Sequence, residues 1–390
     1  MIVSGEASGD MHGARLVRSM LNRDPDLVFC GMGGKELRAA GVEILYDAAG
    51  LAVVGITEVI SHLGDILSAR KALIRRMQMT HPALLILIDY PDFNLLLAAK
   101  AKQLGIPIFY YISPQVWAWR KGRTKKIGRL TDRIAVILPF EQEFYASYGI
   151  KVDFVGHPLV DGVHARVDRD GFLRQHDIPM NNTIIGLLPG SRSKEIRNLL
   201  PDFLRAAALL ADRIDPDCTF LIPKASTVPL ALLRENGLSQ YEDRLDIRVI
   251  EENRYDLMGA CEAVVAASGT VTLELAILGV PTVVTYRVSP KTYQLGRMLV
   301  RNVKYFSLVN LIAGQQIIPE LLQDEVTPEA IAAKLEQQLI DRQHRKTLLN
   351  GLAEVRHRLG RGGASDRAAD IALEIIASSG ATAPLHPTHE

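Results

Sequence analysis

The chain has 390 residues, more than one compact core usually holds, so two domains of roughly 150 to 200 residues each are expected. Its 45 Lys and Arg residues nearly balance 44 Asp and Glu residues, which argues against nucleic acid as a partner bound by bulk charge. The widely separated cysteines, Cys30, Cys218 and Cys261, exclude a disulfide framework and predict a reducing compartment. The longest clean apolar run, Ala83 to Ile88, is far below the ~18 residues of a membrane span, and no signal-type segment opens the chain. Secretion and integral membrane residence are therefore not expected, whereas binding to a membrane surface stays open.

Short apolar runs alternate along the chain with longer amphipathic runs. The apolar runs predict strands at Ile2–Ser4, Leu27–Cys30, Ala83–Ile88, Ile106–Tyr111, Arg133–Leu138, Thr183–Leu188, Cys218–Ile222, Asp246–Ile250, Ala263–Ala267 and Pro281–Tyr286. Helices are expected in most gaps, for example Met11–Leu21, Asp92–Leu104, Ile196–Ile214 and Val271–Leu278. Several strands are apolar throughout, which is typical of a parallel sheet covered on both faces. The order predicts an α/β fold with doubly wound sheets.

A polar, loop-like stretch at 156–182 separates two such series. We therefore expect two Rossmann-like domains, residues 1–160 and 161–350, followed by C-terminal helices over 351–379 that pack back. The tail, 380–390, is too poor in apolar residues to pack and is expected to be disordered.

Polar and Gly-rich segments follow the predicted strands in both halves. In open α/β sheets, ligands bind beyond the carboxyl ends of the strands. The segments that follow strands here are Gly5–Asp10, Asp89–Asn94, Ser113–Trp119, Pro189–Arg192 and Ser268–Thr270. Because both domains carry such strand ends, we expect a ligand in the cleft between them.

Two segments of the second half are typical of anion sites. Ser268-Gly269-Thr270 precedes a helix, whose N-terminus attracts anions, and Glu274 lies one turn further on, within reach of a sugar hydroxyl. A phosphate with a sugar hydroxyl indicates a nucleotide, whereas a capped helix with a solvated glutamate is the alternative that spacing alone favours. Gly190-Ser191-Arg192 repeats the arrangement, and the guanidinium could neutralise a departing diphosphate in place of a metal ion. A surface arginine is the alternative.

Carboxylates of the first half are candidates for acid–base chemistry. Asp89 sits at a strand tip, where it could serve as general base for a hydroxyl nucleophile or as a structural hydrogen-bond acceptor. Asp92 follows Pro91 and is most simply a helix N-cap. For Glu6 and Ser8, in the first Gly-rich turn, a functional role and a structural role both stay open.

An apolar stripe at helical spacing follows the second strand. Its members are Ile56, Val59, Ile60, Leu63, Ile66 and Leu67. Core packing is the default interpretation of such a stripe, and a membrane-docking face is the alternative. The basic residues between Arg120 and Arg133 could form a solvated helix face or could meet anionic lipid.

Six ordered strings of the chain resemble the lipid-A-disaccharide synthase family. They are SGEASGD (4–10), IDYPDFN (88–94), ISPQVWAWR (112–120), LPGSR (188–192), ASGT (267–270) and SLVNLIAG (307–314). The resemblance implies an inverting glycosyltransferase of the two-domain GT-B type. It also implies transfer of 2,3-diacylglucosamine from UDP-2,3-diacylglucosamine to 2,3-diacylglucosamine 1-phosphate, which gives UDP and a β-1,6-linked disaccharide 1-phosphate. The family works without a bound metal or other cofactor, at the cytoplasmic face of the inner membrane.

The resemblance also implies roles for the candidate residues. Asp89 would take the proton of the acceptor 6-hydroxyl, with Glu6 and Ser8 on the acceptor side. UDP would depart onto Arg192 and the helix start at Ser268. The nucleotide-binding set would be Gly190, Ser191, Arg192, Ser268, Gly269, Thr270, Glu274 and Asn310. Because both substrates carry acyl chains, docking on the inner-membrane surface becomes the favoured role of Val59, Ile60, Leu63, Ile66 and Leu67.

Several alternatives stay open at this point. Another GT-B enzyme that uses UDP-N-acetylglucosamine, either a transferase or a 2-epimerase, has the same layout. An inactive UDP-binding protein of the membrane surface and an NAD-dependent oxidoreductase are further candidates, the latter weakened by the broken glycine fingerprint at 31–34. A homo-oligomer is also open. The family normally has a longer first strand, so an upstream start or a weakened first strand is expected.

Overall fold

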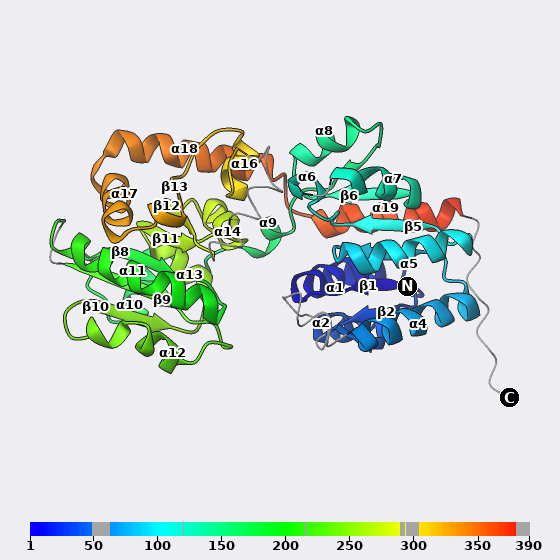
Figure 1. The fold of residues 1–390 in the computed structure, drawn as a ribbon, viewed down its shortest axis with the longest axis horizontal. Coiled ribbons are helices and arrows are strands. Elements are labelled where there is room, and N and C mark those ends of the chain that lie inside the picture. Colours follow the sequence, from blue (N-terminus) through cyan, green and yellow to red (C-terminus); the bar gives the residue numbers. More distant parts are fainter. Residues whose placement is uncertain (49–62, 120, 215–216, 289–292, 294–303, 380–390) are drawn as a thin grey trace. The chain divides into compact units, whose positions relative to one another are not determined.

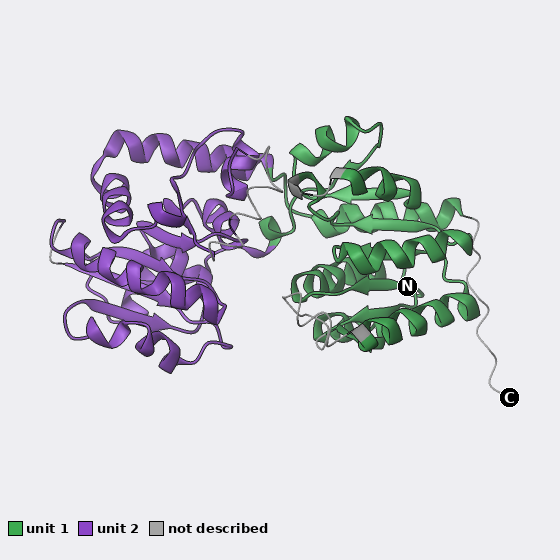
Figure 2. Cartoon of the chain, viewed as in Figure 1, with its two compact units in different colours: residues 1–161, 359–390 green, residues 162–358 purple. Residues whose placement is uncertain are grey.

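The computed structural model describes residues 1–48, 63–119, 121–214, 217–288, 293 and 304–379. The chain forms two compact units, Met1–Asp161 with Leu359–Glu390 (unit 1) and Gly162–Arg358 (unit 2) (Figure 2). The expected 351–379 segment is therefore shared between the units. Within the described ranges, no helix is both long and apolar enough to cross a membrane.

Unit 1 is built on a seven-stranded parallel sheet in the order β3-β2-β1-β4-β5-β6-β7 (Figure 1). Its strands are β1 (Ile2–Ser4), β2 (Cys30–Gly33), β3 (Glu43–Asp47), β4 (Leu85–Ile88), β5 (Ile108–Tyr111), β6 (Arg133–Val136) and β7 (Asp153–Phe154). The short strand β1 is fully buried between β2 and β4. A Cβ on Gly31 would lie 1.7 Å from the carbonyl oxygen of Ile2, so this pairing requires glycine.

Helices cover both faces of the unit 1 sheet, as a doubly wound fold requires. They are α1 (Ala7–Leu21), α2 (Lys35–Ala39), α4 (Leu63–Thr80), α5 (Pro91–Gln103), α6 (Val116–Trp119), η2 (Lys121–Arg123), α7 (Thr124–Leu130), α8 (Phe140–Ala146), α9 (Leu159–Gly162) and α19 (Ala364–Ser378). Val3, Leu87 and Tyr110 pack into one apolar cluster with α4 and α5. Ile2 and Ile88 pack into the opposite cluster with α1 and α19.

Unit 2 has a six-stranded parallel sheet in the order β10-β9-β8-β11-β12-β13. Its strands are β8 (Thr183–Leu188), β9 (Cys218–Pro223), β10 (Asp246–Ile250), β11 (Ala263–Ala267), β12 (Thr282–Tyr286) and β13 (Glu320–Leu322). Its helices are α10 (Arg169–Gln175), α11 (Ser193–Ala211), α12 (Leu230–Glu235), η3 (Leu238–Gln240), α13 (Arg254–Ala260), α14 (Val271–Leu278), α16 (Leu308–Ala313), η4 (Gln323–Glu325), α17 (Pro328–Ile340) and α18 (Arg342–Arg358). Two parallel sheets with helical cover confirm the predicted α/β class.

The last two helices belong to different units. Helix α18 ends unit 2, whereas α19 packs against α1 in unit 1 through the cluster that contains Ala368 and Ala372. Arg23, just after the end of α1, pairs with Asp366 and Asp370 of α19, at 3.1 and 2.6 Å. The C-terminal helix thus completes the core of the N-terminal half.

Candidate active site

Each unit carries a polar site at the carboxyl edge of its sheet, where the fold exposes the ends of its strands. In unit 1 the site centres on Asp89, directly after β4. Asp89 and Tyr90 both have left-handed backbone conformations, with φ of 42° and 45°. A non-glycine residue in this region costs about 1–3 kcal/mol and persists only where its surroundings enforce it. The turn therefore marks Asp89 as a functional candidate on its geometry.

The electrostatics of Asp89 suit a general base. Burial of this carboxyl group, and next the negative charge of Glu6, raise its pKa to about 6, which a hydrogen bond from the backbone of Tyr90 partly offsets. A carboxyl group with a pKa near the working pH is ionised in much of the protein and still binds a proton strongly enough to act as a general base. Glu6 follows β1 and Asp89 follows β4, and because these strands are parallel neighbours both residues lie at the same edge of the sheet.

The other unit 1 candidates have distinct surroundings. Glu6 is the N-cap residue of α1 and is exposed, and Ser8 is exposed in the first turn of that helix. A Cβ on Gly5 would lie 2.4 Å from the ring of Tyr90, so glycine there lets the Asp89 turn pack against the first loop. Asp92 is not the N-cap of α5, because the helix begins at Pro91 with Tyr90 as N-cap. Instead, Asp92 forms an ion pair with Arg123.

Glu141, in the first turn of α8, is a second buried carboxyl group on this side of unit 1. It is 1% exposed, and one carboxyl oxygen accepts a 3.0 Å hydrogen bond from the N–H of Leu138. Burial raises the pKa of Glu141 to about 8, and the charge of Asp89 contributes to the same direction, so the group is largely protonated at pH 7. It therefore adds little negative charge beside Asp89.

Replacement of Glu141 by glutamine is expected to stabilise the protein at neutral pH. The pKa of the folded state, about 8, lies above the ordinary value of 4.5, so the unfolded chain gives up this proton first and stability falls as pH rises from 4.5 to 8. Glutamine removes that dependence, a gain of about 3 kcal/mol at pH 7 and almost nothing near pH 4.5. Urea unfolding of both proteins at the two pH values measures it. An equal change at both pH values would contradict the protonated state.

In unit 2, a cavity of about 530 Å³ opens at the carboxyl ends of β8, β9, β10 and β11. It brings together seven of the predicted nucleotide-binding residues. They are Gly190, Ser191, Arg192, Ser268, Gly269, Thr270 and Glu274. Two separate strand-to-helix turns thus meet around one cavity.

The first turn, after β8, depends on a glycine. Gly190 has φ of 103°, and a Cβ there would lie 2.2 Å from Oε2 of Glu195. Arg192 is the N-cap residue of α11, and its guanidinium lies 3.2 Å from Oε1 of Glu195 with 70% of the side chain exposed. An exposed guanidinium at a helix N-terminus is available to an anion in the cavity.

The second turn, after β11, leads into α14 with Thr270 as N-cap. Its glutamate, Glu274, is 5% exposed, and Oε1 accepts hydrogen bonds from Arg254 at 2.7 Å and from the Tyr255 hydroxyl at 3.4 Å. Burial raises the pKa of Glu274, and Arg254 opposes that rise. Glu274 is therefore a held acceptor in the cavity wall, not a solvated side chain.

Further residues of the cavity were not predicted. They are Lys224, Glu251, Asn253, Arg254 and Met258, together with Glu195 and several apolar or small neighbours. Lys224 has a side chain 9% exposed and lies 2.9 Å from Glu251. Lys224 directly follows β9 and Glu251 directly follows β10. The rule that ligands bind beyond the carboxyl ends of parallel strands, which singled out Asp89 and Arg192, therefore applies to them too.

Asn310 does not line this cavity. It is 0% exposed, and its amide is used within the chain: Nδ2 donates to Ile318 and Glu320, and Oδ1 accepts from Ile317 and Ile318. The residue ties α16 to the segment before β13. The structure thus gives the SLVNLIAG string a packing role at this position.

The predicted docking stripe is described only at its C-terminal end. Val59, Ile60 and Ile56 lie outside the described residues, as does the side chain of Leu63. Ile66 packs against the core cluster beneath α4, whereas Leu67 is 54% exposed. The stripe therefore combines a core residue with a solvent-facing one.

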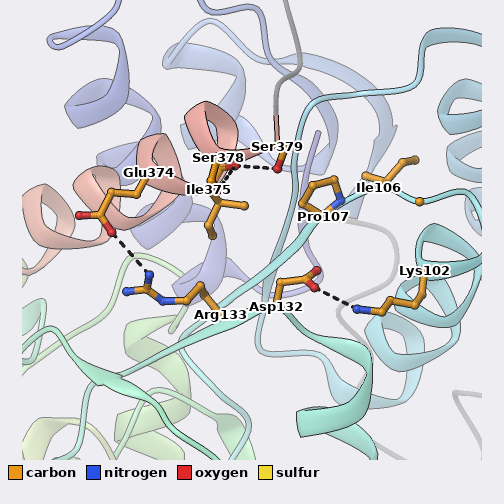
Figure 3. Close-up of a pocket in the computed structure, with 10 residues that line it drawn as sticks. Lys102, Ile106, Pro107, Asp132, Arg133, Glu374, Ile375, Ser378 and Ser379 are labelled. Carbon is orange, nitrogen blue, oxygen red and sulfur yellow. Dashed lines mark hydrogen bonds and ion pairs between the residues drawn. The ribbon is translucent and has the colours of Figure 1, made fainter.

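A second cavity, of about 570 Å³, lies at the opposite, amino edge of the unit 1 sheet (Figure 3). Its charged groups are paired with one another: Lys102 lies 2.9 Å from Asp132, and Arg133 lies 3.5 Å from Glu374. Because the cavity lies at the amino edge of the sheet, away from the strand ends where open α/β sheets bind ligands, it is not a candidate site. Among the residues that the structure describes, no three His, Cys, Asp or Glu side chains are grouped so as to hold a metal ion.

Comparison with known proteins decides the family. The model of the family described as lipid-A-disaccharide synthetase matches residues 1–375. The chain belongs to the lipid-A-disaccharide synthase family. The lipid-A-disaccharide synthase of Geobacter metallireducens is 48% identical over 376 residues, which cover 96% of this chain and 97% of that one. This chain is therefore a glycosyltransferase of lipid A biosynthesis, as the six strings predicted.

Solved structures confirm the GT-B fold of this lipid-A-disaccharide synthase family member. A glycotransferase of kitacinnamycin superposes with a TM-score of 0.65 at 17% identity, covering 96% of this chain and 98% of that one. The UDP-GlcNAc 2-epimerase of Neisseria meningitidis, bound to UDP-GlcNAc, superposes with a TM-score of 0.60 at 13% identity, covering 97% and 99%. At these identities the likeness concerns the fold alone, and the family match does not favour an epimerase.

Proposed function

We propose that the chain transfers 2,3-diacylglucosamine from UDP-2,3-diacylglucosamine to the 6-hydroxyl of 2,3-diacylglucosamine 1-phosphate. The single observation that carries this proposal is the family match over residues 1–375. The two sites support it physically. The unit 1 site offers Asp89, a half-buried carboxyl group whose pKa of about 6 suits a general base. The unit 2 site offers the Arg192 guanidinium and two helix N-termini around a cavity.

The donor binds in the unit 2 cavity. Its diphosphate lies against the turn at Gly190 to Arg192 and against the start of α14 at Ser268 to Thr270, where the guanidinium and the helix ends favour negative charge. Glu274 accepts hydrogen bonds from the ribose hydroxyls, since it is already held as an acceptor by Arg254. The Lys224–Glu251 pair extends the polar wall of the nucleotide site.

The acceptor binds at the unit 1 edge, beside Glu6 and Ser8, and Asp89 removes its proton. As the carboxylate takes the 6-hydroxyl proton, the oxygen forms a bond to the anomeric carbon and the bond from that carbon to the diphosphate breaks. UDP carries away the electron pair, and the anomeric configuration inverts to β. Arg192 stabilises the charge that grows on the diphosphate, the contribution a metal ion would otherwise make.

Product analysis tests this reaction. Incubation with both lipid substrates should yield a β-1,6-linked disaccharide 1-phosphate, identified by mass and by the anomeric coupling in NMR. UDP-N-acetylglucosamine serves as the matched donor, because its sugar carries one N-acetyl group in place of the two acyl chains of the lipid donor. Formation of its 2-epimer, or transfer of N-acetylglucosamine as readily as of the acylated sugar, would contradict the proposal and favour the alternative GT-B enzymes.

Acylated substrates require access to a bilayer, so we also propose that the chain works at the cytoplasmic face of the inner membrane, with Leu67 on its docking surface. Replacement of Leu67 by glutamate is expected to weaken binding to anionic vesicles roughly tenfold, because a side chain that would enter the interface becomes charged. The fold should survive, since this side chain is 54% exposed.

Co-sedimentation with vesicles measures the effect. Val28, which is 84% exposed outside the stripe, provides the control as Val28→Glu. Equal losses in the two variants, or none in the Leu67 variant, would place the docking surface elsewhere.

A further inference from the structure

The backbone carbonyl of Asp89 is the focus of a buried hydrogen-bond cluster beneath the candidate base. The Tyr110 hydroxyl donates to it at 2.6 Å, and Nδ2 of Asn94 donates to it at 2.7 Å. Nδ2 of Asn94 also lies 3.1 Å from the carbonyl oxygen of Ile88. Both donor side chains are 0% exposed. Two buried side chains from different elements therefore converge on one peptide of the turn.

This cluster holds two consecutive residues in a backbone conformation that costs free energy for any residue other than glycine. Asp89 and Tyr90 are both left-handed, a pair of conformations that L side chains disfavour. The N–H of Asp89 donates to the carbonyl of Ile112, at the end of β5, at 3.2 Å, so the residue is tied to β5 on both sides of its Cα. With its N–H and carbonyl both fixed, the Cα–Cβ direction of Asp89 is fixed too, and only side-chain rotation remains.

The positions of the two donors follow from the sheet. Tyr110 pairs with Leu87 in the register of β4 and β5, and both side chains lie on the face of the sheet that α4 and α5 cover. Asn94 lies in the first turn of α5, where its N–H also donates to the carbonyl of Tyr90. Burial raises the pKa of the Tyr110 phenol well above its usual range, so the hydroxyl keeps its proton and remains a donor.

We propose that Tyr110 and Asn94 are positioning residues, which aim the Asp89 carboxylate at the acceptor hydroxyl by holding its peptide in the left-handed turn. The inference rests on the proposed role of Asp89 as general base. Neither residue touches the reacting atoms, and both act through Asp89. Misplacement of a base by a fraction of an ångström slows proton transfer while leaving substrate binding nearly unchanged.

The chain supplies a matched control. Tyr111 is the next residue on β5, is equally buried, and packs into the apolar cluster on the other face of the sheet. Tyr110→Phe and Tyr111→Phe therefore each remove one hydroxyl from the same strand, but only the first removes a bond to Asp89. Asn94→Ala removes the second donor and serves if Tyr110→Phe fails to fold.

The test measures kcat, KM and UDP affinity for these variants, alone and combined with Asp89→Asn. Tyr110→Phe should lower kcat about 10-fold to 100-fold with KM and UDP affinity within about twofold of the wild type. Tyr111→Phe should keep its kcat. In the Asp89→Asn background, Tyr110→Phe should cause no further loss, because a residue that acts only through the base has nothing left to position.

The outcomes separate this inference from the proposed function. An inactive Asp89→Asn protein with a normal Tyr110→Phe protein would overturn the inference alone. So would a Tyr110→Phe loss that adds fully to that of Asp89→Asn, or an equal loss in Tyr111→Phe. Normal turnover of Asp89→Asn would overturn the proposed role of Asp89 and the inference with it.

Discussion

Asp89→Asn is expected to lower kcat by about 10²- to 10⁴-fold while leaving UDP affinity unchanged. The amide keeps the size and the turn of the aspartate but cannot accept the acceptor proton, so the variant loses the contribution of a general base. In the proposed reaction UDP binds in the unit 2 cavity, which this substitution does not touch.

The pH dependence gives a second readout of the same group. Because the base must be ionised, kcat/KM of the wild type should fall tenfold per unit as pH decreases below about 6, the pKa that burial and Glu6 impose on Asp89. The variant should lack this limb. Initial rates between pH 5 and 8 for both proteins measure it. An unchanged limb in Asp89→Asn, or near-normal turnover, would assign the base to another group.

Arg192→Ala is expected to produce the second large loss, about 10²- to 10³-fold in kcat, because in the proposed reaction the guanidinium stabilises the charge that appears on the diphosphate as the bond breaks. The loss of donor affinity should be smaller than the loss of kcat. The side chain is 70% exposed in the free protein, and the bound donor carries less negative charge on its diphosphate than the transition state does. Arg192→Lys should recover only part of the rate, as a point charge replaces a planar, bidentate donor.

Arg197→Ala, an exposed arginine on the same helix, is the control for general charge effects. Thermal unfolding should be nearly unchanged in both variants, because Arg192 contributes an exposed ion pair with Glu195 that is worth little. Equal losses of kcat in the two variants would show that bulk charge near α11 matters and would remove Arg192 from the reaction.

The sequence predicted the central strands well because a strand buried on both faces is apolar throughout. Strand β2 was expected at Leu27–Cys30 but spans Cys30–Gly33, where two glycines carry no β signal and the close approach to β1 decides the pairing. The edge strands β3, β7 and β13 were missed. They are short or half-exposed, and their pairing depends on neighbours that local pattern does not show.

The candidate site followed from a topological rule: residues after parallel strands share one edge. That rule placed Asp89 with Glu6 and placed Arg192 with Ser268, but applied to β9 and β10 it would also have found Lys224 and Glu251. The rule does not reveal roles that depend on tertiary contacts. Examples are Asn310, whose partners lie seven to ten residues on, and Tyr110, which reads as an ordinary core aromatic.

Release of UDP from UDP-2,3-diacylglucosamine, measured in EDTA with and without 2,3-diacylglucosamine 1-phosphate, tests the central claim most directly. We expect release only when the acceptor is present, at a rate that EDTA does not change, because Arg192 and the helix starts of the unit 2 cavity carry the departing charge. A protein that binds UDP but releases none from the donor in the presence of acceptor would contradict glycosyl transfer.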